Sequence, residues 1–87
     1  MKGSNALQEA KEIHDLIKSK DIYPNKSYTV DTLAEKLGLN PETIRVYIRD
    51  MKKDGMEVPL KVGKSYTFSG LWVAKLFSWL YEKQLLQ

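Results

Sequence analysis

The sequence predicts a mainly helical fold with a small β-hairpin. Apolar residues recur at helical spacing in separate segments, and two short alternating segments flank a glycine. The chain of 87 residues has an apolar content of 43%, which is ordinary for a globular protein and leaves room for one modest core. We therefore expect a single domain over residues 1–87.

The first helix is predicted from about Asn5 to Lys20, after a loose end at residues 1–4. Asn5 and Gln8 have the spacing of a capping box. A turn at residues 21–26 and a short extended segment, Ser27–Thr29, follow. The apolar stripe of this helix is Leu7, Ala10, Ile13 and Ile17, with Leu16 beside it.

The next two helices are short and are separated by a tight turn. Asp31 is the expected N-cap of the second helix, and Gly38 ends it in a left-handed conformation. Asn40 and Pro41 predict the start of a third helix over residues 41–54. The small Ala34 allows the helices to cross closely, and Leu39 is expected to be a buried plug. The other wedge residues are Leu33, Leu37, Ile44 and Ile48.

Residues 56–62 and 65–68 alternate apolar and polar side chains around Gly63-Lys64, which predicts a β-hairpin. The last helix is expected from about residue 71 to residue 86. Two short helices around a glycine turn, followed by a hairpin, are typical of a winged helix-turn-helix. The predicted core of this fold spans residues 5–69, and residues 70–87 add an extra C-terminal helix.

The segment Thr29–Arg45 resembles the helix-turn-helix of biotin-repressor-type and DeoR-type winged-helix regulators. Residues 54–58 and 62–68 resemble the wing of the biotin repressor. The likeness implies a winged-helix fold and DNA binding by the third helix and the wing. Val46-Tyr47 replaces the basic pair common in DeoR-type proteins. No ligase or sensor domain accompanies the motif, so biotin chemistry does not transfer and we expect no small-molecule effector.

The positive charge is concentrated near this motif. The net charge of the chain is +3, but residues 1–44 hold six basic and seven acidic side chains. Residues 45–64 hold six basic side chains against three acidic ones. A local basic patch of this kind attracts the phosphates of a nucleic acid.

The predicted partner is therefore double-stranded DNA, with the third helix in the major groove. Near base edges we expect Thr43, Val46 and Arg49, with Arg49 on guanine and Val46 on a thymine methyl group. Glu42 shares this face of the helix. Phosphate contacts are expected from Arg45, Lys52, Lys53, Lys61 and Lys64. Hydroxyl or backbone contacts are expected from Ser27, Tyr28 and Thr29.

The last helix is apolar over an arc of roughly 200°, more than one packing face needs. Part of this arc is expected to close the core, and the rest to form an exposed patch that marks an interface. We expect a homodimer, which would space two recognition helices on a palindromic site. The alternatives are another protein or a small ligand on this helix. The predicted dimer residues are Trp72, Leu76, Phe77, Trp79 and Leu80.

Several function classes are disfavoured by composition. The chain has no cysteine, and His14 is its only histidine, so neither a disulfide framework nor a metal site is expected. We expect no catalytic residues and no cofactor, because no nucleophile or carboxylate pair has a recognisable setting. No leader or membrane-spanning segment is predicted, which favours a cytoplasmic protein.

The leading interpretation is a sequence-specific DNA-binding regulator, either a chromosomal transcription factor or a phage or plasmid control protein. The main alternative is a winged-helix module that docks proteins without binding DNA, since fold alone does not decide function. RNA binding stays open, although the aromatic strand pattern of common RNA-binding sheets is absent.

Overall fold

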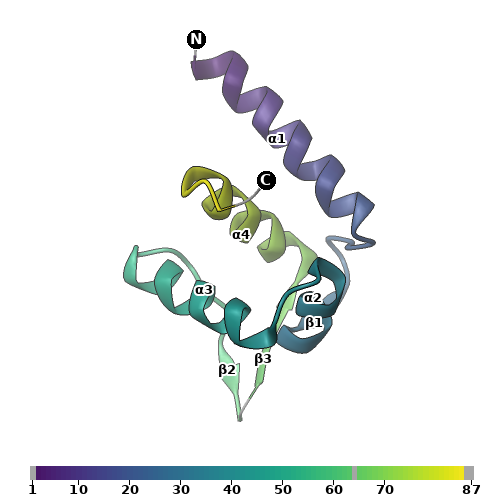
Figure 1. Ribbon diagram of the computed structural model, residues 1–87, viewed down its shortest axis with the longest axis vertical. Helices are drawn as coiled ribbons and strands as arrows, with labels where there is room; N and C mark the ends of the chain where they lie inside the picture. The colour runs from purple at the N-terminus through teal and green to yellow at the C-terminus, as the bar shows by residue number, and fades with distance from the viewer. Residues whose placement is uncertain (1, 64, 86–87) are drawn as a thin grey trace.

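The computed structural model describes residues 2–63 and 65–85, which form four helices and a small three-stranded antiparallel sheet (Figure 1). This confirms the predicted mainly helical fold with a small sheet. Within these ranges, every helix is too short or too polar to cross a membrane. The elements in chain order are α1 (Lys2–Ser19), β1 (Ser27–Thr29), α2 (Val30–Leu37), α3 (Pro41–Lys53), β2 (Lys61–Val62), β3 (Ser65–Ser69) and α4 (Gly70–Glu82).

The sheet joins segments that are far apart in the sequence. β3 lies between β1 and β2 and is antiparallel to both. Tyr28 of β1 lies opposite Phe68 of β3, and both side chains are buried in the core. β2 has only two residues, so most of the strand predicted over residues 56–62 is a loop. Pro59 lies in this loop and has no N–H group to donate to a neighbouring strand.

The start of α2 differs from the prediction. Its N-cap is Thr29, whose Oγ1 accepts a hydrogen bond from the Thr32 backbone N–H at 3.3 Å. The expectation that Asp31 caps this helix is wrong, because the extended Thr29 leads straight from β1 into α2. Asp31 lies in the first helical turn instead, where its negative charge favours the positive end of the helix.

The turn between α2 and α3 forms as predicted. Gly38 ends α2 with a φ of 69°, in the left-handed region that glycine adopts without strain. Asn40 Oδ1 accepts a hydrogen bond from the Glu42 backbone N–H at 2.9 Å, and Pro41 occupies the first helical position of α3. The predicted start of the third helix is therefore confirmed.

Most of the predicted wedge between α2 and α3 is buried, with Leu37 half-buried at its edge. Leu39 is 39% exposed, so its expected role as a buried plug is wrong. The chain leaving the left-handed turn places Leu39 at the rim of a shallow cavity beside Tyr47. The buried wedge residues are Leu33, Ala34, Ile44 and Ile48.

The apolar arc of α4 faces the interior of the molecule, and the predicted exposed patch is wrong. α4 lies between α1 and α3 (Figure 1), and it also packs against β3. One helix that contacts three neighbours buries a wider arc than a helix with a single packing face. The residues predicted to form a dimer interface are all buried in the core: Trp72, Leu76, Phe77, Trp79 and Leu80.

The outer ends of α1 and α4 also differ from the predictions. α1 begins at Lys2, so residues 2–4 are helical and Asn5 lies inside the helix rather than at its cap. A glycine within a helix lowers helix stability by only about 1 kcal/mol relative to alanine, and residues 2–4 contain no proline, so the helix can extend through Gly3. α4 ends at Glu82 rather than near residue 86, and Gln84 follows it in a left-handed conformation with a φ of 60°.

Candidate nucleic-acid interface

α3 presents one apolar and one basic side. Ile44, Ile48 and Met51 are spaced i, i+4 and i+7, which puts them on one side of the helix, and all three are buried against the core. Basic side chains of α3 are exposed on the other side, as the helical period predicts. We call these side chains, together with the exposed Lys61 of β2, the basic face: Arg45, Arg49, Lys52, Lys53 and Lys61. Lys61 Nζ lies 5.9 Å from the centre of the Tyr66 ring, and Tyr66 lines the same cleft as Arg45.

The hairpin adjoins α3 on the flank that carries Arg45. A small polar cleft lies between the start of α2, the Arg45 side chain and the hairpin residues Ser65 and Tyr66. The hairpin projects away from the core past α3 (Figure 1). The fold therefore brings α3 and the hairpin together in one surface. Lys64, the other predicted hairpin contact, lies outside the described residues.

Glu42 is the acidic member of this surface. Its carboxylate lies 3.3 Å from Arg45 Nη1 and 3.8 Å from Arg49 Nη2. All three side chains are exposed, Arg45 least at 43%, and exposed ion pairs of this kind are worth only about 0–1 kcal/mol. The two guanidinium groups can therefore exchange Glu42 for a phosphate or a base edge at little cost.

The remaining predicted contacts on α3 are less accessible. Thr43 and Val46 are half-buried, so each offers part of its side chain at the surface. On β1, Ser27 and Thr29 are exposed, but Thr29 Oγ1 already accepts the capping hydrogen bond of α2.

Tyr28 was predicted to contact DNA through its hydroxyl or its backbone, and the hydroxyl part of this prediction is wrong. The side chain is buried, and its hydroxyl accepts a hydrogen bond from the Tyr23 backbone N–H at 2.7 Å. Side chains alternate along a strand, so the central residue of Ser27–Thr29 faces the core when its neighbours face solvent. The alternation in the sequence was sufficient to predict this orientation.

A contact that the sequence did not predict fixes the C-terminal end of α3. The Trp79 indole N–H donates to Asp54 Oδ2 at 2.8 Å, and Lys83 Nζ lies 3.1 Å from the same oxygen. These two hydrogen bonds hold the pKa of the Asp54 carboxyl below its usual value. Trp79 also packs edge-on against Tyr47 of α3, with ring centroids 6.1 Å apart. The end of α3 is thus tied to the end of α4.

No protein-family model, curated protein or solved structure matches this chain.

Proposed function

We propose that this protein is a winged helix-turn-helix domain that binds double-stranded DNA and acts as a regulator without catalytic activity. The observation that carries the proposal is the basic face. It places arginine and lysine side chains of α3 and of the adjoining hairpin on one exposed surface. Basic side chains gathered on one helix and a neighbouring ribbon are the electrostatic footprint of nucleic-acid binding.

The order and pairing of the elements support this proposal. A helix-turn-helix formed by α2 and α3 is followed by the hairpin β2–β3, which would serve as the wing. β1 extends the sheet on the far side of β3 and ties the start of α2 to the base of the hairpin. In this arrangement α3 enters the major groove and the wing follows the phosphate backbone.

Each residue of the surface has an assigned role in the proposal. Arg49 reads guanine through a forked contact, and Val46 and Thr43 approach neighbouring bases. Arg45 leaves Glu42 to bind phosphate. The other phosphate contacts are made by Lys52, Lys53 and Lys61, and the sequence adds Lys64 to this set.

Charge-removing variants test the proposal in a duplex-binding assay by fluorescence anisotropy. On duplexes of random sequence, Lys52→Ala and Lys61→Ala should each weaken binding and lower the slope of log K against log salt by about one. The matched control is Lys11→Ala, which removes an exposed lysine from α1, away from the basic face. Its affinity and salt slope should equal those of the wild type.

Arg49→Ala should act differently from the lysine variants. On a duplex selected for tight binding, this variant should lose about 1–3 kcal/mol of binding free energy, and its preference for one base should weaken at a single position of the site. If Lys11→Ala weakens binding as much as the α3 variants do, the charge of the whole chain and not this surface drives binding. Absence of salt-dependent binding would favour the protein-docking alternative.

A further inference from the structure

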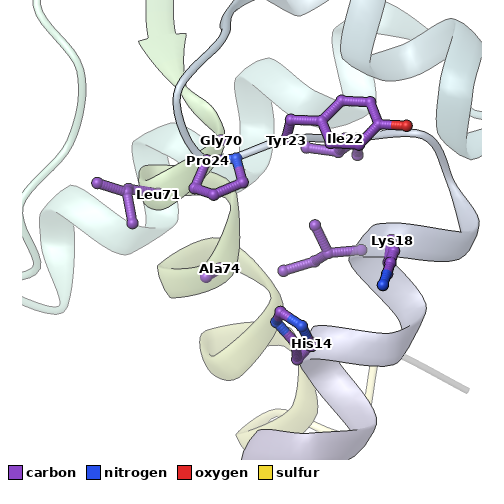
Figure 2. Close-up of a pocket in the computed structure, with 9 residues that line it drawn as sticks. His14, Lys18, Ile22, Tyr23, Pro24, Gly70, Leu71 and Ala74 are labelled. Atoms are coloured by element: carbon purple, nitrogen blue, oxygen red, sulfur yellow. The ribbon is translucent and has the colours of Figure 1, made fainter.

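A second surface lies away from the basic face, where α1 meets the start of α4. It is an open groove of about 300 Å³ (Figure 2). Its walls come from α1, from the loop before β1 and from the first two turns of α4. The residues that line it are His14, Ile17, Lys18, Ile22, Tyr23, Pro24, Gly70, Leu71 and Ala74.

The groove is mostly apolar and remains unfilled by the residues that the structure describes. Ile17 and Ile22 are buried core residues, whereas Leu71 is 65% exposed and Tyr23 is 39% exposed. Exposed apolar walls around a concave site are typical of a surface that another molecule covers.

The walls of the groove are held in place by backbone contacts. The Gly70 N–H donates to the Lys26 carbonyl at 3.1 Å, and the Tyr23 N–H donates to the Tyr28 hydroxyl at 2.7 Å. Gly70 packs so closely on the Tyr23–Pro24 backbone that a Cβ atom would lie only 2.9 Å from Pro24 Cα. The site is therefore formed before any partner binds, which lowers the cost of binding.

Lys18 and His14 are the polar side chains of α1 that line the groove, and both are exposed. Lys11 lies one turn before His14 on the same side of α1, which also carries the exposed Asp15. Neither lysine pairs with an acid in the described part of the chain. Asp21, which precedes the loop wall in sequence, accepts a hydrogen bond from the Tyr23 hydroxyl, and its carboxylate lies 3.7 Å from Lys36 Nζ. Its charge is therefore already paired with Lys36.

We propose that this groove docks a segment of a partner protein that carries large apolar side chains flanked by aspartate or glutamate. A cavity of roughly 150 Å³ holds one benzene-sized group, so the groove has room for about two such side chains. An acidic residue of the segment would pair with Lys18 and accept a hydrogen bond from His14, the two polar side chains of α1 that line the groove.

Two other occupants fit the groove less well. A symmetric pair of chains would place the same surface on both sides of the contact, and the lining of the second groove offers no acidic side chain to Lys18. A small ligand is normally enclosed over most of its surface, but this groove is open along the Leu71 side. A peptide segment with apolar and acidic side chains matches both the positive charge of Lys18 and the open shape of the groove.

The proposal stands apart from DNA binding, because no residue of the basic face lines the groove. The test is a selection of random peptides displayed on phage against the full chain, followed by affinity measurement on synthetic copies of the enriched peptides. Enriched peptides should combine large apolar residues with acidic ones. Leu71→Ser and Lys18→Glu should each weaken their binding roughly tenfold or more.

The matched control is Leu60→Ser, which changes an exposed leucine of similar character near the hairpin and should leave peptide affinity unchanged. Circular dichroism must show that each variant is folded, as expected for exposed positions. The proposal would be overturned if the enriched peptides bind the Leu71→Ser and Lys18→Glu variants as tightly as the wild type, or if the enriched peptides are basic. The proposal would also be overturned if sedimentation shows a wild-type dimer that is lost in Leu71→Ser. A third contradicting result would be that octanoate saturates the groove while no selected peptide binds.

Discussion

Gly70→Ala is expected to destabilise the fold by about 3 kcal/mol, the upper end of the usual cost of overpacking. A Cβ atom at this position would lie 2.5 Å from the Tyr23 carbonyl carbon and 2.9 Å from Pro24 Cα, and closer still to the Tyr23 oxygen. These are backbone atoms, so the clash cannot be relieved by rotating a side chain. The start of α4 would have to move away from the loop, which would also break the Gly70 hydrogen bond to Lys26.

Denaturation in urea, followed by circular dichroism, measures this loss of unfolding free energy. The control is Gly38→Ala, where a Cβ meets no atom within 4 Å but the φ is +69°. That variant should cost about 1–2 kcal/mol, the penalty for a left-handed alanine. If Gly38→Ala lowers the unfolding free energy more than Gly70→Ala does, then the close approach of α4 to the loop does not require glycine at position 70.

Phe77→Ala is expected to lower the unfolding free energy by about 3–5 kcal/mol, because it leaves a cavity in a fully buried site. A domain of this size has a total stability of about 5–15 kcal/mol, so the variant should be close to unfolding. The matched control on the same helix is Leu71→Ala, which shortens a side chain that is 65% exposed. Its effect should stay within about 0.5 kcal/mol.

The pair of variants also separates a core residue from an interface residue. If Phe77 packed against a second copy of the chain, its replacement would change self-association and leave the stability of the monomer nearly intact. A Phe77→Ala protein that unfolds at the same urea concentration as the wild type would contradict its place in the core.

Local signals in the sequence predicted much of the fold. Gly38, Asn40 and Pro41 specify the end of one helix and the start of the next through the conformations that these residues favour. The i, i+4, i+7 spacing of Ile44, Ile48 and Met51 determined which side of α3 faces solvent. That orientation also predicted which basic side chains of α3 are exposed.

The error on α4 arose because neighbours in the folded structure, rather than the local sequence, decide which of its side chains are buried. The number of elements that surround α4 is not encoded in its own periodicity, so the sequence could not separate a core helix from an exposed one. The hydrogen bond from Trp79 to Asp54 joins residues 25 positions apart, and the groove arises from the close packing of Gly70 on a distant loop. Tyr28 is different, because the alternation of β1 was visible and was not used.

An NMR titration of the ¹⁵N-labelled protein with a short duplex tests most directly whether DNA binds on α3 and the hairpin. We expect the amide signals of α3, of residues 60–63 and of the start of α2 to shift with added DNA. Signals of residues 10–19 in α1 should remain in place. Shifts centred on α1 and the start of α4, or no shifts at low salt, would contradict the account.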